Sequence, residues 1–175
     1  MRPQIRIRAV VYAAIHAGVC AALLVTTSAH QSQGTRVTPA KPPTILFMCP
    51  HGAAKSVLAS AYFQRLAKER GLNVHVISAG TDPEPQVAPA VASHLTKNGY
   101  EVPVSKPRRV TDAEMSNADV VISIGCDLTG LPTPRGTFMN WDDVPALSQD
   151  FARADEKIRQ RVIQLVDELV RKHQR

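Results

Sequence analysis

Three short, uninterrupted apolar runs constrain the fold of this chain more than any other feature of its sequence. They occupy 44–49 (TILFMC), 74–79 (VHVISA) and 119–124 (DVVISI), and each is typical of a strand that is buried on both faces. Segments with helical periodicity alternate with these runs, which indicates a parallel sheet covered by helices on both faces. We therefore expect a three-layer α/β fold, with 138–141 as the fourth strand of a four-stranded parallel sheet.

Start and stop signals delimit the expected helices. A helix that begins at Ser56 should end at Gly71, and the next helix should end at Gly99, because glycine favours the residue after a helix. A threonine and a glutamate in capping-box positions predict a short helix over 111–117. A long amphipathic helix is expected over 150–173, since its apolar residues recur on one stripe.

The first 29 residues have the pattern of an export signal. Three arginines and no acidic residue occur there, the run 9–25 is uncharged, and small residues follow it. Cleavage after Ala29 would make the protein periplasmic or secreted. If the segment were retained it would act as a membrane anchor, because its length is at the short edge of a bilayer span. A polar, proline-rich linker is expected over 30–43 and a folded domain over 44–175.

The charge of the chain gives no strong case for a nucleic acid partner. With 21 Lys and Arg against 15 Asp and Glu the formal net charge is +6, and it falls to +3 without the three arginines of the signal. A charge of this size does not favour nucleic acid. No acidic residue precedes Glu69, however, so the sequence around Cys49 is locally cationic and suits an oxyanion substrate.

The segment 49–56 (CPHGAAKS) joins the first strand to the first helix and carries the candidate chemistry. It is not a nucleotide-binding loop, because G-x-x-x-x-G-K-[ST] requires glycine where Cys49 and Ala54 stand. Its backbone N–H groups and the helix N-terminus can surround an anion and favour the thiolate of Cys49 over the thiol. Lys55 would neutralise the oxyanion and Ser56 would donate to the sulfur. The alternative is a buried structural cysteine beside a solvated lysine.

From residue 44 to about 172 the chain resembles the low-molecular-weight protein tyrosine phosphatases and their thioredoxin-coupled arsenate reductase relatives. The family's C-x5-R-S motif corresponds to 49–56, its S-A-G-T strand end to 78–81, its T-x-x-x-[LM] segment to 111–115 and its A-D-x-[VI]-[IV] strand to 118–122. The resemblance implies the same three-layer fold and a cysteine-dependent activity that uses no metal and no cofactor.

The resemblance also implies a role for individual residues. Cys49 would be the nucleophile and Asp143 the general acid, with Asp142 as the alternative acid. Cys126 takes the position of the first resolving cysteine of the arsenate reductases, whose second resolving cysteine is absent here; the alternative is that Cys126 is an inert buried thiol. The substrate oxyanion would be held by Lys55 and by the loop residues Pro50, His51, Gly52, Ala53, Ala54 and Ser56. Two of these, His51 and Ala53, resemble the arsenate reductase branch more than the phosphatases.

Several positions depart from the family pattern. Lys55 replaces the arginine whose planar fork grips two phosphoryl oxygens, and the loss of such a donor could cost on the order of 3 kcal/mol in the transition state. Gly52 replaces an asparagine and Ala54 replaces a second cysteine. In the family the general acid is an aspartate followed directly by a proline, whereas one residue separates Asp143 from Pro145 here. The tyrosines that line the family's substrate mouth are missing, which does not favour phosphotyrosine specificity.

Three functions fit these observations. The first is a phosphatase that works through a phosphocysteine intermediate. The second is an arsenate reductase that uses Cys49 and Cys126, and the third is a non-catalytic domain that binds oxyanions. In an exported protein the same two cysteines could also form a disulfide. The expected partner is a phosphate or arsenate oxyanion, or a phosphoprotein that carries one. We expect a monomer with no nucleic acid partner, and a membrane partner only if the N-terminal segment is retained.

Overall fold

The computed structural model of the protein describes residues 41–174. The predicted signal peptide and nearly all of the predicted linker therefore lie outside the described residues, and the expected localisation stays a prediction. Among residues 41–174, no helix is both long enough and apolar enough to cross a membrane.

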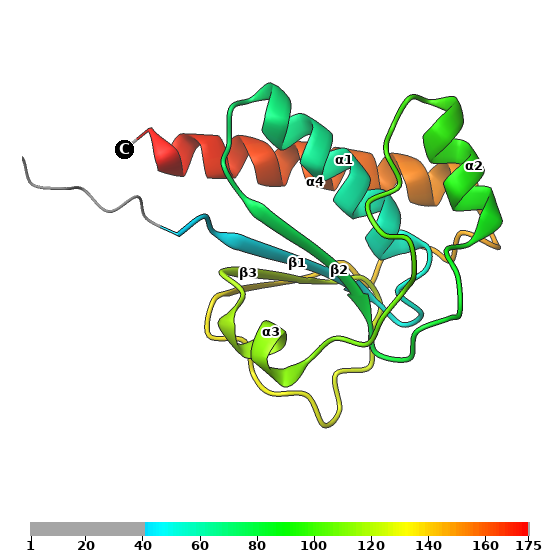
Figure 1. The fold of residues 1–175 in the computed structure, drawn as a ribbon, viewed down its shortest axis with the longest axis horizontal. Coiled ribbons are helices and arrows are strands. Elements are labelled where there is room, and N and C mark those ends of the chain that lie inside the picture. Colours follow the sequence, from blue (N-terminus) through cyan, green and yellow to red (C-terminus); the bar gives the residue numbers. More distant parts are fainter. Residues whose placement is uncertain (1–40, 175) are drawn as a thin grey trace, which may run out of the picture. The chain divides into compact units, whose positions relative to one another are not determined.

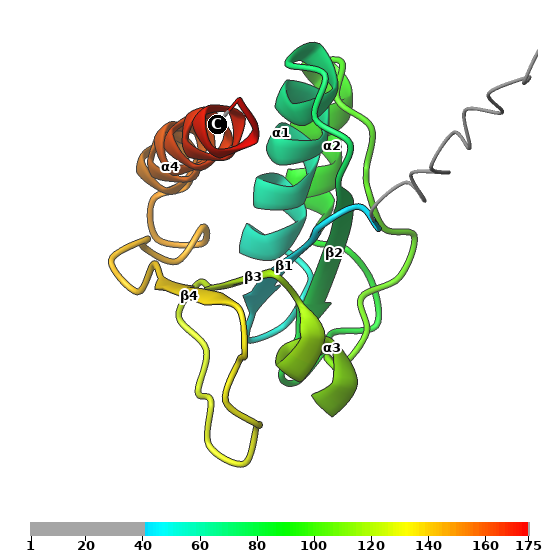
Figure 2. The same ribbon diagram turned by 90° about the vertical axis from the view of Figure 1, so that its left-hand side faces the viewer.

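The four strands form one parallel sheet in the order β2-β1-β3-β4 (Figures 1 and 2). They are β1 (Thr44–Cys49), β2 (His75–Gly80), β3 (Val120–Ser123) and β4 (Thr137–Asn140). Every residue of β1 is buried, because β1 has a strand on each side and a helical layer on each face. β4 is an edge strand and is mostly exposed. The expected four-stranded parallel sheet is confirmed.

Helices cover both faces of this sheet (Figures 1 and 2). They are α1 (Lys55–Glu69), α2 (Pro89–Lys97), α3 (Asp112–Asn117) and α4 (Phe151–His173). The first, second and fourth lie on one face and the short α3 lies on the other. The three-layer fold predicted from the alternation of strands and helices is thus confirmed.

The side chains of β1 divide between two apolar cores, as the alternation along a strand requires. Ile45, Phe47 and Cys49 belong to the core under α1 and α4, whereas Leu46 and Met48 belong to the core on the side of α3. The Phe47 ring centroid lies 5.5 Å from that of Phe63 in α1 and 6.0 Å from that of Trp141. Trp141, only 5% exposed, is therefore part of the core.

Local sequence signals define the ends of two helices. Thr111 and Glu114 form the expected capping box at the start of α3, with side chain to backbone hydrogen bonds in both directions. Asp150 caps α4 by accepting a hydrogen bond from the N–H of Arg153 (3.0 Å).

Two arginines that the sequence places off the apolar stripe of α4 are nevertheless half-buried. The guanidinium of Arg159 lies 4.6 Å from the ring centroid of Tyr62, and that of Arg161 lies 5.5 Å from that of Trp141. Each guanidinium therefore lies over an aromatic ring, as in a cation–π contact, and also pairs with a carboxylate, that of Asp155 for Arg159 and that of Asp143 for Arg161.

The sheet topology puts a binding site at the end of β1. The chain leaves β1 to form β2 on one side and later returns to form β3 on the other, so the strand order reverses at β1. Ligands of open parallel sheets bind outside the carboxyl ends of the strands at such a switch point. Cys49 is the last residue of β1, and the loops after β2 and β4 flank it.

Candidate active site

Cys49 lies at the bottom of the candidate site, between the end of β1 and the first turn of α1. Its side chain is 3% exposed, and its Sγ lies 3.2 Å from Ser56 Oγ. The backbone N–H of Ser56 donates to the same sulfur at 3.5 Å. Both groups of Ser56 can thus hydrogen-bond the sulfur when it carries negative charge, at the positive end of the α1 dipole. The structure brings Cys49 and Ser56 together as the sequence predicts.

The loop after Cys49 is held against β2 by two glycines. A Cβ on Gly80 would lie 2.5 Å from the backbone nitrogen of Gly52, and a Cβ on Gly52 would lie 2.8 Å from that of Gly80. Gly52 also has φ +58°, a left-handed conformation that disfavours other residues. In this chain position 52 therefore favours glycine, because the two backbones are in contact there.

The segment that follows β2 is fastened to this loop by its own backbone. Residues 82–88 run beside 50–53, and three N–H groups of the first segment donate to carbonyls of the second. The hydrogen bonds run from Asp82 to Pro50 (2.8 Å), from Glu84 to His51 (3.1 Å) and from Ala88 to Ala53 (3.0 Å). The second wall of the site is thereby fixed relative to the nucleophile.

A cavity of about 430 Å³ opens above Cys49. Six of the predicted residues line it, namely Cys49, Pro50, His51, Ala53, Ala54 and Lys55. Glu84, the beginning of α2, residues 146–148 and Phe151 complete the walls. Gly52 and Ser56 are buried and do not line it.

Lys55, the first residue of α1, brings a positive charge to one side of the cavity. Its Nζ donates to the carbonyl of Val144 at 3.4 Å, and it lies 3.0 Å from where a Cβ on Gly125 would be. The ammonium group therefore lies between α1 and the loops that follow β3 and β4. As a compact point charge it can attract an oxyanion, but it lacks the bidentate geometry of arginine.

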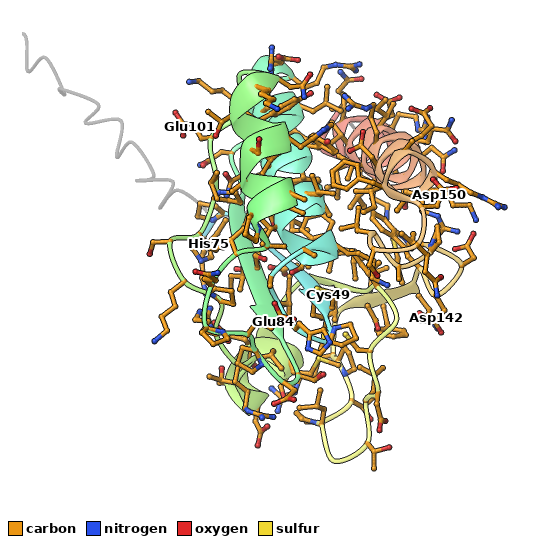
Figure 3. The ribbon with its side chains drawn as sticks, turned by 90° about the vertical axis from the view of Figure 1, so that its right-hand side faces the viewer. Cys49, His75, Glu84, Glu101, Asp142 and Asp150 are labelled. Atoms are coloured by element: carbon orange, nitrogen blue, oxygen red, sulfur yellow. The ribbon has the colours of Figure 1, made fainter. Side chains whose placement is uncertain are left out.

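The two candidate acids do not line the cavity. The carboxylate of Asp143 accepts from Lys157 Nζ (2.6 Å) and Arg161 Nη2 (2.5 Å), both on α4. The hydrogen bond from Lys157 lowers the pKa of Asp143, and the charge of Arg161 acts in the same direction, so this arrangement keeps the group ionised. Asp142 accepts from the N–H of Gly125 at 3.1 Å. Figure 3 shows Asp142 on the far side of Cys49 from Glu84.

Cys126 follows β3 and is half-buried outside the cavity. Burial raises the pKa of its thiol to about 11, and the charge of Cys49 acts in the same direction. Both cysteines are free thiols. The resolving role of Cys126 stays a prediction.

The sequence profile of one family, the low molecular weight phosphotyrosine protein phosphatases, matches residues 44–131. The chain belongs to this family. Its relatives include both phosphatases and arsenate reductases. A putative arsenate reductase of Halobacterium salinarum is 28% identical over 127 residues, which are 70% of this chain and 89% of that protein.

Solved structures of the family have the same fold. The thioredoxin-dependent arsenate reductase of Corynebacterium glutamicum superposes with a TM-score of 0.65 at 26% identity, over 77% of this chain and 65% of that one. The present chain thus spans just under two thirds of that protein. A low molecular weight phosphotyrosine phosphatase of Vibrio cholerae gives a TM-score of 0.63 at 20% identity, covering 73% of this chain and 96% of that one, a likeness that concerns the fold alone.

The sequence did not reveal two residues of the site. Val144, which precedes Pro145, is buried and accepts a hydrogen bond from Lys55 at its backbone carbonyl, a contact that the sequence does not indicate. Glu84 lines the cavity from the segment after β2. The predicted parallel sheet could have indicated Glu84, because the loops that follow neighbouring parallel strands meet at the same edge of the sheet.

Proposed function

We propose that this protein is a cysteine-dependent phosphatase that hydrolyses phosphate monoesters through a phosphocysteine intermediate. The observation that carries this proposal is the position of Cys49 Sγ, 3.2 Å from the hydroxyl and 3.5 Å from the N–H of Ser56 at the start of α1. A nucleophile in this position attacks an oxyanion that is held by the loop N–H groups and by Lys55.

The reaction has two steps. The thiolate of Cys49 attacks phosphorus, the bond from phosphorus to the leaving oxygen breaks, and the electron pair and a proton go to that oxygen. Water then attacks phosphorus and breaks the sulfur–phosphorus bond, which releases phosphate and restores the thiolate. We assign the first proton to Asp143, which would have to leave Lys157 and Arg161 and take up a proton from water before it could donate to the leaving group; the water that hydrolyses phosphocysteine returns a proton to it.

Turnover of p-nitrophenyl phosphate under reductant tests this proposal. The full-length chain should hydrolyse this substrate, and Cys49→Ser should abolish hydrolysis. Lys55→Arg should raise turnover by up to about a hundredfold, because arginine restores the bidentate grip on the transition state. Equal turnover by Cys49→Ser would exclude the mechanism. Activity that appears only in Lys55→Arg would favour a domain that binds oxyanions without hydrolysing esters.

Arsenate reduction is the second candidate, and the arsenate reductase relatives favour it together with a second free thiol, Cys126, after β3. Cys49 would attack arsenate, and Cys126 would then attack the Cys49 sulfur. The two electrons of the new disulfide reduce arsenic from the +5 to the +3 state, and an external dithiol reductant restores both thiols. If the free thiols of Cys49 and Cys126 are lost only when arsenate is added, this function is supported. If both thiols persist in the presence of arsenate, it is excluded.

We further propose that the protein acts outside the cytoplasm, on the strength of the signal pattern in residues 1–29. Sequencing the N-terminus of the protein recovered from its host should find residue 30 first. An intact N-terminus in a membrane fraction would instead support the anchored form.

A further inference from the structure

The cavity above Cys49 carries opposite charges at separate positions of its wall. Lys55 supplies the positive charge, at the side of the β3 and β4 loops. Glu84 is the one acidic residue among the residues described as lining the cavity, and it comes from the other side, after β2. Figure 3 shows Cys49 and Glu84 at the same end of the molecule.

The backbone at Glu84 is fixed relative to Cys49. Its N–H donates to the carbonyl of His51 at 3.1 Å, inside the loop that begins at the nucleophile. Only four residues earlier, Gly80 is in backbone contact with Gly52. The side chain of Glu84 therefore extends from a fixed point of the backbone at the cavity wall.

The charge of Glu84 is also largely unneutralised. In the described part of the chain, its one ion-pair partner is His51, whose Nδ1 is 4.0 Å from Glu84 Oε1. The side chain of Glu84 is 50% exposed and that of His51 is 59% exposed. The nearby Arg109 pairs with Asp82 at 3.4 Å. Glu84 thus brings a negative charge to the wall of the cavity.

Apart from His51 and Ser148, the rest of the cavity is lined by apolar residues, including Val91, Leu147 and Phe151. A ligand that fits this arrangement has an oxyanion near Lys55, an apolar body, and a positive charge near Glu84. We propose that Glu84 is a specificity residue that selects phosphate monoesters whose leaving group is apolar and ends in a cation, such as an aryl phosphate bearing an amine. This inference rests on the proposed phosphatase function for its substrate class.

The expected selectivity is modest because Glu84 is half exposed. A solvent-exposed ion pair favours binding by at most a factor of about five. A ligand with a carboxylate in place of the amine should meet a repulsion of similar size. The ratio of the two affinities should therefore be about tenfold in low salt, and it should shrink as salt screens the charges.

Binding of two matched ligands tests the inference. The full-length chain with Cys49→Ser is titrated by calorimetry with 4-(2-aminoethyl)phenyl phosphate and with 4-(2-carboxyethyl)phenyl phosphate. We expect the amine to bind about tenfold tighter, the ratio to approach one in Glu84→Gln, and the preference to reverse in Glu84→Lys. Glu101→Gln removes an exposed carboxylate that does not line the cavity and should leave the ratio unchanged.

The outcomes separate this inference from the proposed function. Three outcomes would overturn the role of Glu84. They are an affinity ratio that persists in Glu84→Gln, an equal affinity of the chain with native Glu84 for both ligands, and no binding of either ligand. The same esters are given to the chain with its native Cys49. If the amine is preferred in binding but neither ester is hydrolysed, the phosphatase proposal fails while Glu84 remains a recognition residue.

Discussion

Gly80→Ala should damage both the stability and the activity of the protein. The added Cβ would lie 2.5 Å from Gly52 N, 2.8 Å from the carbonyl carbon of His51 and 2.9 Å from Gly52 Cα. All three are backbone atoms, so no side-chain rotation relieves the overlap. Ordinary contact requires the two backbones to separate by about 1 Å, because carbon atoms pack at about 3.5 Å. Overpacking of this kind costs about 1 to 3 kcal/mol.

The separation also moves the loop that surrounds the oxyanion. A misplacement of about 1 Å in a catalytic arrangement can lower the rate about a hundredfold. We expect urea unfolding to show a loss of about 2 to 3 kcal/mol, and turnover of p-nitrophenyl phosphate to fall about a hundredfold in the protein that remains folded.

Gly99→Ala is the matched control for this experiment. Gly99 has φ +71° and no atom within 4 Å of an added Cβ, so alanine there introduces only left-handed strain of about 1 kcal/mol. Its turnover should match that of the native chain, since Gly99 does not line the cavity. Native stability and turnover in Gly80→Ala would refute the close approach of the two loops.

Two further predictions concern titratable groups. The hydrogen bond from Arg108 lowers the pKa of Glu114 from 4.5 to about 2, so Glu114 stabilises the fold above pH 4.5 and this contribution is lost as the pH falls to 2. At this partly exposed pair the loss should be about 1 kcal/mol, and urea unfolding should show it in the native chain but not in Glu114→Gln. Burial raises the pKa of Cys126 to about 11, so iodoacetamide should modify Cys126 slowly at pH 8 and faster near pH 11. Rapid modification at pH 8 would contradict its buried position.

The strands and helices could be predicted from the sequence because their signals are local. The apolar run 44–49 became β1 without a change of bounds, and the capping box at Thr111 formed as expected. The position of Cys49 also followed, because the last residue of a central parallel strand lies at the switch point. Burial, periodicity and end signals were sufficient for this part of the account.

The partners of the acidic residues could not be predicted in the same way. Asp143 was assigned from its nearness to a proline, whereas in the structure it binds Lys157 and Arg161, which follow it by 14 and 18 residues. Which side chains meet across that distance depends on the packing of α4 against the sheet. The position of Glu84 at the cavity was also not predicted, because it depends on the tertiary contact between the loops that follow β1 and β2.

Exchange of oxygen between phosphate and water is the decisive test of whether Cys49 forms a phosphocysteine. If Cys49 forms a covalent bond with the oxyanion held in the loop, the full-length chain should catalyse the loss of heavy oxygen from labelled inorganic phosphate into water. No ester and no leaving group are needed, because phosphate and Cys49 form phosphocysteine and water, and hydrolysis then returns unlabelled oxygen. We expect exchange by the native chain and none by Cys49→Ser. Exchange that persists in Cys49→Ser, or no exchange by the native chain, would contradict it.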